Sequence, residues 1–203
     1  SDLTVNGITV GKGGGAIASN TAIGDSALYS NTTGNRNTAN GVNALRQNTT
    51  GSLNTANGYY ALYSNTTGWN NTANGYAALQ NNTIGIGNTA NGRRALTNNT
   101  TGSSNTANGV NALYSNTTGI YSTATGNGAL SANTTGNYNT AFGRVALSAN
   151  TTGSGNIALG YQANVSSGNL SNATTIGNGA IVTASNRVRI GNSSVSRIGG
   201  QVA

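Results

Sequence analysis

The sequence predicts an all-β protein, a parallel β-solenoid of the β-roll type with rungs of 17 residues. Three observations lead to this prediction. The motif Asn-Thr-Ala-Asn-Gly or a close variant returns every seventeen residues, and nine copies that start at position 20 keep this spacing without an insertion. A second block, Ala-Leu-x-x-Asn-Thr-Thr-Gly, keeps the same period. Asn, Thr and Gly are weak helix formers and no apolar face recurs at helical spacing, so stacked extended repeats are favoured.

We number the positions of each rung as registers 1 to 17, with Asn20 at register 1 of the first rung and Asn156 at register 1 of the ninth. Gly at registers 5 and 15 predicts two turns per rung, joined by two strands of about four residues. We expect these glycines to supply positive φ angles and the Asn residues at registers 1 and 12 to form amide ladders. Rungs about 4.8 Å apart would make a rod of about 40 Å.

Alternation along the first strand places registers 2 and 4 on one side and register 3 on the other. Register 3 is Ala in all nine rungs, which indicates a site for a small side chain. Register 9 is Leu in the first eight rungs, and we expect Ala and Leu to form the two sides of a thin core. The predicted core ladder is Leu28, Leu45, Leu62, Leu79, Leu96, Leu113, Leu130 and Leu147.

Register 4 predicts a contact between chains. One Leu and two Ala per rung bury too little apolar surface to offset the conformational entropy of seventeen ordered residues, so we expect an obligate oligomer. Register 4 is polar in the middle rungs and apolar at both ends, which suits a symmetry axis shared by several chains. An exposed Asn ladder with unrelated apolar residues at its ends is the alternative. The predicted axis residues are Ile23, Asn40, Asn57, Asn74, Asn91, Asn108, Phe142 and Leu159.

The repeats divide the chain into three parts. Residues 1–19 form an N-terminal cap or leading segment, in which Leu3 to Gly11 alternate like a strand or hairpin and Gly13 to Gly15 are expected to be flexible. Residues 20–165 form the solenoid of nine repeats. Residues 166–203 contain an insertion, further irregular rungs and a C-terminal connector.

The composition argues against an enzyme. The chain has no Cys, His, Met or Pro, and its two acidic residues are Asp2 and Asp25. Apart from Asp25, general bases and the usual ligands of metal ions are therefore missing from the repeats, and we expect no catalytic, cofactor or metal site. The net charge of +7 comes from scattered residues, with Arg93 and Arg94 as a local pair, so no nucleic-acid partner is expected. No apolar stretch predicts membrane insertion, and the first residues do not resemble a signal peptide.

Two stretches resemble known families. Asn20-Thr-Ala-Ile-Gly24 and Asn139-Thr-Ala-Phe-Gly143 resemble the repeats of trimeric autotransporter adhesin heads of the YadA-like type, over residues 20 to about 185. That resemblance implies a homotrimer of β-rolls. The stretch from Val188 to Ala203 resembles the segment that precedes the endosialidase-type intramolecular chaperone in phage tail fibres and tail spikes. This second resemblance implies a trimeric fibre, assembled by a chaperone that is absent from this sequence.

Together these features predict a non-enzymatic fibre shaft or host-surface adhesion protein of a phage or phage-like tail fibre, located in the virion. A trimeric adhesin head at a bacterial surface, and so an extracellular location, is the alternative. A third hypothesis is an ice-binding solenoid, because Thr recurs at registers 2, 13 and 14. Aromatic and Arg side chains at variable registers suit a host-surface glycan, although Tyr is also common on exposed strands. The predicted glycan contacts are Tyr59, Tyr60, Trp69, Tyr76, Arg93 and Arg94.

Overall fold

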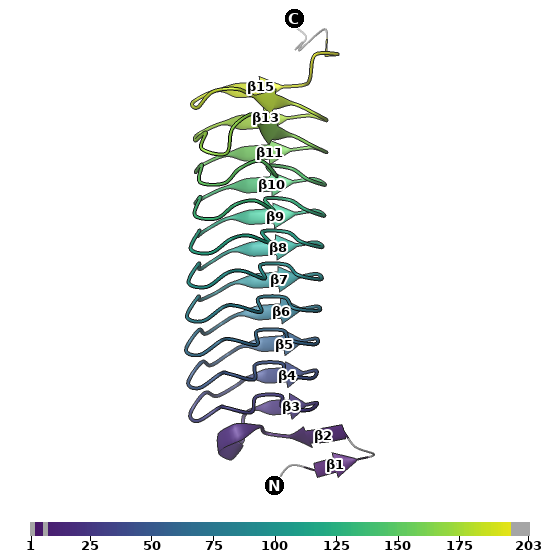
Figure 1. Ribbon diagram of the computed structural model, residues 1–203, viewed down its shortest axis with the longest axis vertical. Coiled ribbons are helices and arrows are strands. Elements are labelled where there is room, and N and C mark those ends of the chain that lie inside the picture. The colour runs from purple at the N-terminus through teal and green to yellow at the C-terminus, as the bar shows by residue number, and fades with distance from the viewer. Residues whose placement is uncertain (1–2, 6–7, 196–203) are drawn as a thin grey trace, which may run out of the picture.

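The protein is a tall stack of flat rungs, each carrying one strand on the same side of the stack (Figure 1). The computed structural model describes residues 3–5 and 8–195. Thirteen strands form one sheet, and they follow one another in sequence order apart from two short strands that pair separately. The strands of the nine regular rungs are β3 (Thr21–Ile23), β4 (Thr38–Asn40), β5 (Thr55–Asn57), β6 (Thr72–Asn74), β7 (Thr89–Asn91), β8 (Thr106–Asn108), β9 (Thr123–Thr125), β10 (Thr140–Phe142) and β11 (Ile157–Leu159).

Neighbouring rungs pair in parallel and in identical register. Thr38 pairs with Thr55, Ala39 with Ala56 and Asn40 with Asn57, and the same correspondence holds from β3 to β11. Register 3 is buried in every strand while registers 2 and 4 are exposed or half-buried. The predicted parallel β-solenoid with 17-residue repeats is thus confirmed.

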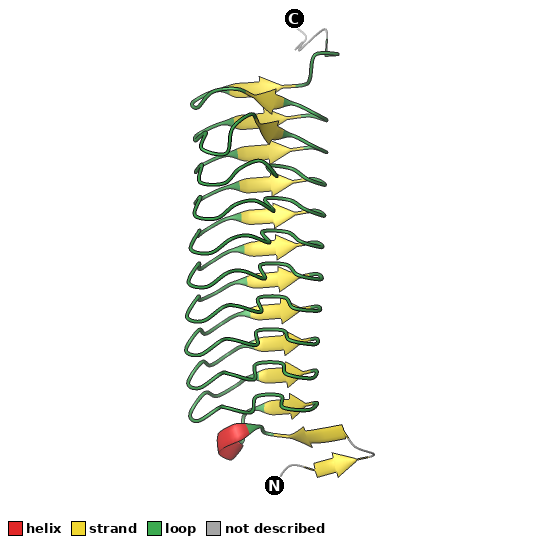
Figure 2. Cartoon of the chain, viewed as in Figure 1, coloured by secondary structure: helices red, strands yellow, loops and turns green. Residues whose placement is uncertain are grey.

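The second strand that we predicted for each rung is absent from the first eight rungs. Registers 6 to 11 of these rungs run as consecutive turns (green in Figure 2), and their strand pairing is confined to registers 2 to 4. The ninth rung differs, because Asn164–Val165 at its registers 9 and 10 form a short strand. Left-handed backbone at registers 7 and 9 is the reason. The Leu residues at register 9 have φ angles between 49° and 52°, which no β-strand accommodates.

A left-handed Leu costs about 1–2 kcal/mol relative to ordinary backbone, so its surroundings must hold it in place. Each of the eight leucines of the core ladder is fully buried. The backbone N–H of Leu45 also donates to the carbonyl oxygen of Ala61 in the next rung at 3.0 Å, and the other rungs repeat this bond. Ala at registers 3 and 8 packs with the leucines in one continuous cluster.

Two columns of buried Asn line the rest of the interior. At register 12 the amide of Asn82 donates to Oδ1 of Asn65 at 2.8 Å and to the carbonyl oxygen of Gly85 at 3.0 Å. At register 1, the side-chain Oδ1 of each Asn accepts a hydrogen bond from the backbone N–H of the register 1 residue in the next rung. For example, the N–H of Asn54 donates to Oδ1 of Asn37 at 3.0 Å. Register 12 therefore forms an amide-to-amide ladder, whereas register 1 joins side chains mainly to backbone.

The glycines at registers 5 and 15 have different roles. Register 5 glycines of the nine rungs have φ between 118° and 140°, a region that residues with a side chain rarely adopt. The prediction of positive φ angles at register 15 was wrong, because none of the glycines at this register has a positive φ. They are needed for close approach instead. A Cβ at Gly119 would stand 2.6 Å from the carbonyl oxygen of Gly136 and would strike the amide of Asn116.

Additional elements follow the regular rungs at both ends of the stack. At the N-terminus β1 (Leu3–Val5) and β2 (Ile8–Gly11) form an antiparallel pair, and β2 lies antiparallel to β3. A short 3-10 turn, η1 (Gly14–Ala16), follows. The segment that we expected to be flexible packs directly on the first rung, where the N–H of Gly14 donates to the carbonyl oxygen of Leu28 at 2.9 Å.

At the C-terminus the solenoid continues past residue 165. Strands β13 (Thr174–Ile176) and β15 (Val188–Ile190) extend the main sheet, while β12 (Asn164–Val165) and β14 (Ile181–Val182) pair beside it. Thr174 pairs with Val188, so the last rung has shortened to fourteen residues. Positions 196–203, half of the stretch that resembles a pre-chaperone connector, lie outside the described residues.

Candidate functional site

The outer face of the sheet carries the predicted axis column. Registers 2 and 4 of every rung point away from the core, so their side chains make two parallel columns along the stack. At register 4 the structure places Ile23 half-buried, Asn40 exposed, the next four Asn and Thr125 half-buried, and Phe142 and Leu159 exposed. We call this surface of registers 2 and 4 the strand face.

The middle of the strand face is a regular polar array. Nδ2 of Asn57 donates to Oδ1 of Asn74 at 2.8 Å, and the chain of amides continues through Asn91 to Asn108 at 2.7 and 2.9 Å. The Thr hydroxyls at register 2 of the same rungs form no side-chain hydrogen bond with any described residue. The strand face therefore has one column of Asn amides that bond to one another, at register 4, and one column of Thr hydroxyls without such bonds, at register 2.

The C-terminal end of the strand face is apolar. Phe142, Leu159, Ile176 and Ile190 stand in register on β10, β11, β13 and β15, and they are 58%, 48%, 37% and 43% exposed. Ile157 and Val188 occupy register 2 of the same region and are also exposed. Exposed apolar side chains that gather in this way mark contact surfaces. Sequence reasoning missed both Ile176 and Ile190. Ile176 keeps the seventeen-residue spacing from Leu159, but its rung begins Ala-Thr-Thr-Ile and lacks the Asn-Thr-Ala motif, whereas Ile190 follows the shortened rung of fourteen residues.

Tyr and Arg collect on the opposite wall of the coil, at registers 6, 7 and 10. Register 3 enters the core from the strand side and registers 8 and 9 enter it from this wall. Most side chains of the flanking registers 6, 7 and 10 are exposed or half-buried here. Seven of the nine Tyr residues and four of the five Arg residues of the repeats lie at these registers. We call this surface the Tyr–Arg wall.

The predicted glycan contacts do not form one group. Tyr59 stacks on Tyr76 with ring centroids 5.7 Å apart, and Tyr60 lies 4.5 Å from Tyr59. The guanidinium of Arg93 lies 5.9 Å from the Tyr76 ring. Arg94 instead lies over Tyr114, whose hydroxyl accepts from its Nη2 at 2.5 Å.

Trp69 belongs to a different surface. It sits at register 16, 49% exposed, and contacts no other aromatic ring among the described residues. Sequence reasoning grouped it with the tyrosines because all of these registers vary. The fold separates them, since register 16 precedes the strand and registers 6 and 7 follow it.

The surroundings of Tyr59 on the Tyr–Arg wall change the pKa of its hydroxyl. This pKa is raised above the ordinary tyrosine value, first by desolvation and then by the neighbouring hydroxyls of Tyr60 and Tyr76. A phenolate at this position would face further tyrosines, so the neutral, hydrogen-bonding form of Tyr59 is favoured.

The three Thr columns differ in their free hydrogen-bonding groups. At register 13 the hydroxyl of Thr49 donates to the carbonyl oxygen of Thr66 at 3.1 Å, and Thr66, Thr83, Thr100 and Thr117 continue the series. Each of these hydroxyls donates its hydrogen bond to the backbone of the next rung. Register 14 is exposed, with Ile84 interrupting its Thr series. The Thr column of the strand face remains the regular one with unused hydroxyls.

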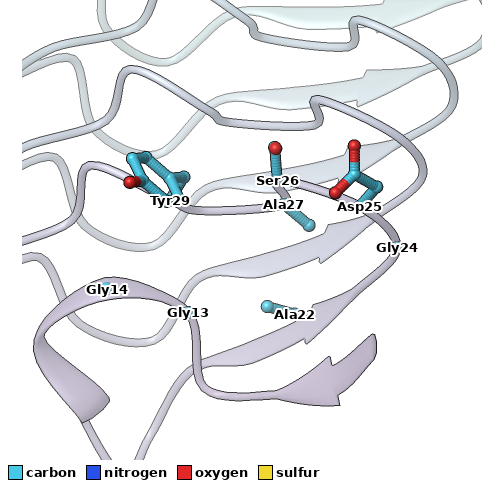
Figure 3. Close-up of a pocket in the computed structure, with 8 residues that line it drawn as sticks. All are labelled: Gly13, Gly14, Ala22, Gly24, Asp25, Ser26, Ala27 and Tyr29. Carbon is cyan, nitrogen blue, oxygen red and sulfur yellow. The ribbon is translucent and has the colours of Figure 1, made fainter. Parts of the chain in front are cut away.

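The base of the stack holds a hollow of about 390 Å³ between the cap and the first rung (Figure 3). Gly13 and Gly14 line it from the cap, and Asp25, Ser26 and Tyr29 line it from the rung. Among the described residues, Asp25 stands without a His, Cys or second carboxylate beside it, and no cluster of three or more metal-ligating side chains is found there. None of the described helices has the length and apolar character required to cross a membrane.

Comparison of the chain with protein-family models, with curated proteins and with solved structures gave no match. The functional argument therefore depends on the geometry of the strand face and the Tyr–Arg wall.

Proposed function

We propose that the protein is a non-enzymatic, homotrimeric fibre shaft of a phage or phage-like tail fibre, which spaces and presents an adhesive surface toward a host cell. Three chains would pack with their strand faces around a common axis. The Tyr–Arg wall of each chain would then face outward. This arrangement uses one face for assembly and the opposite one for contact with the host.

The apolar end of the strand face is the observation that carries the proposal. Four large apolar side chains in register on adjacent strands would face water in an isolated chain, at a cost that burial against sister chains removes. The Asn column in the middle rungs suits the same axis. Buried Asn residues fix the alignment of chains in other symmetric assemblies, at some cost in stability.

The mass of the assembled particle in native buffer tests this proposal. We expect three times the chain mass of 20.1 kDa. The substitutions Leu159→Asn and Ile176→Asn replace two of the four apolar side chains with amides and should shift the particle toward monomer. Val110→Asn, an exposed apolar position on the opposite wall, is the matched control and should leave the mass unchanged. A stable wild-type monomer would overturn the homotrimer.

Spin labels test which face lies at the axis. The chain has no Cys, so Asn74→Cys and Asn127→Cys each introduce a single attachment site. Asn74 lies on the strand face and Asn127 on the opposite wall. In a trimer with the proposed axis, labels at position 74 broaden one another strongly and labels at 127 do not. The reverse pattern would place the axis on the Tyr–Arg wall.

The same architecture also fits a trimeric adhesin head at a bacterial surface. The gene context separates the two: a C-terminal chaperone domain favours the fibre, and a membrane-anchor barrel favours the adhesin. The assembly argument is common to both.

Ice binding is a second candidate, favoured by the unused Thr hydroxyls of the strand face. A monomer with measurable thermal hysteresis, abolished by Thr72→Val and Thr89→Val, would support this function over the shaft. An absence of hysteresis, together with a trimeric mass, would eliminate it.

A further inference from the structure

We propose that the Tyr–Arg wall carries a binding strip for an acidic polysaccharide, running along the stack from the first rung to the fifth. This inference deepens the proposed adhesive function by naming the class of ligand. It depends on contacts that join residues of successive rungs into one continuous surface.

Arg46 is the centre of the N-terminal half of the strip. Its guanidinium lies between two tyrosine rings, 5.8 Å from the centroid of Tyr29 and 6.0 Å from that of Tyr63. Nη1 donates to the hydroxyl of Tyr63 at 3.0 Å. Nε of Arg46 is buried and has no hydrogen-bond acceptor. The site thus contains a positioned cation with an unmet donor.

The C-terminal half is a stack of tyrosines that ends on Arg93. Tyr59 and Tyr76 stack with an interplanar angle of 8°, and Arg93 lies beyond Tyr76 with its side chain exposed. Tyr60 joins the two halves, because its ring contacts Tyr63 at 4.8 Å and Tyr59 at 4.5 Å. From Arg46 in the second rung to Arg93 in the fifth, the strip spans three rung spacings, or about 14 Å along the stack.

The charge of the strip is available to a ligand. Neither Arg46 nor Arg93 pairs with a carboxylate among the described residues, and Asp25 is the single acid in the repeats. A guanidinium binds a carboxylate best through two parallel N–H donors. Nε of Arg46 is buried and out of reach of a ligand, so the terminal nitrogens of the guanidinium would donate to an oxyanion here.

The spacing of the cations favours a sparsely charged polymer. Uncharged tyrosines separate Arg46 from Arg93, whereas a nucleic-acid footprint requires a dense row of basic residues. The faces that Tyr59 and Tyr76 turn toward each other are not free for stacked bases. Carboxylates separated by uncharged, hydroxyl-rich sugars match both features: guanidinium groups at intervals, and tyrosine hydroxyls between them.

Affinity for polygalacturonate tests the strip, with dextran as the neutral polysaccharide and single-stranded DNA as the charged competitor. We expect binding of polygalacturonate that weakens with salt and no binding of dextran. Arg46→Gln and Arg93→Gln should each lower the affinity about tenfold. Arg36→Gln removes the same charge from an exposed residue outside the strip and should change the affinity less than twofold by general electrostatics.

Several outcomes would overturn the inference: equal affinity for dextran, equal or tighter binding of DNA, or an equal loss in the Arg36→Gln control. The native mass of the same samples keeps the two proposals separate. A trimer that binds none of the three polymers leaves the shaft standing and removes the strip. A monomer that binds polygalacturonate through Arg46 and Arg93 removes the shaft and keeps the strip.

Discussion

Removing one amide from the buried ladder at register 12 should destabilise the protein far more than removing the adjacent amide outside it. Asn82→Ala deletes three hydrogen bonds: two donated by its Nδ2, to Asn65 and Gly85, and one donated to its Oδ1 by Asn99 at 2.8 Å. The site is fully buried, so water cannot replace the lost partner. At about 1–1.5 kcal/mol for each bond, the expected loss is about 3–5 kcal/mol.

Asn81→Ala is the control, because it removes an amide from the next position in the chain. Asn81 is half-buried and makes one side-chain bond, to Asn98 at 3.2 Å, so solvent can hydrate what remains. We expect a loss below about 1 kcal/mol. Urea unfolding followed by circular dichroism measures both variants, and the shift in midpoint at constant slope gives the difference. Equal shifts for Asn82→Ala and Asn81→Ala would refute the argument that burial of the ladder decides its energetic weight.

Two further predictions concern backbone packing and pH. Gly119→Ala should destabilise by about 3 kcal/mol or more in the same urea assay, because its Cβ would collide with the backbone of the next rung. Gly87→Ala should cost about 1 kcal/mol, because its Cβ would make only an ordinary contact of 3.7 Å with Oγ of Ser104 and its cost is that of the positive φ. Similar losses would contradict the close-approach role of register 15. The raised pKa of Tyr59 means that the unfolded chain ionises this group first. Its contribution to stability is therefore complete below the ordinary tyrosine pKa and is lost as pH rises from there through the raised pKa of the folded state. Ultraviolet titration of folded protein should show one late-ionising tyrosine that Tyr59→Phe removes; identical curves for the wild type and this variant would contradict the assignment.

The solenoid itself could be predicted because its signal is periodic and local. Seventeen-residue spacing places identical residues above one another, and alternation around Ala at register 3 identifies the buried side of the strand. The last rung escaped the prediction for the same reason. Its fourteen-residue length breaks the period, so the count from Asn156 did not include Ile190 in the strand face. Ile176 keeps the period, but the motif around it has changed to Ala-Thr-Thr-Ile.

The wall opposite the strand face could not be predicted in the same way. Leu at register 9 is a poor candidate for left-handed backbone by itself, and the conformation persists through bonds such as that from Leu45 to Ala61 in the next rung and through complete burial. This backbone brings registers 6, 7 and 10 together, so it also decides that Arg46 lies between two tyrosines while Trp69 lies elsewhere.

By itself the sequence determined the period, the parallel stacking, the alternation of the strand and the identity of the core ladder, because each of these follows from the chemistry of residues seventeen positions apart. The tertiary structure alone decided where strand gives way to turn, how the two Asn columns divide their hydrogen bonds, and which variable side chains meet. Those outcomes depend on backbone angles that are costly for an isolated residue and are held only by contacts between rungs.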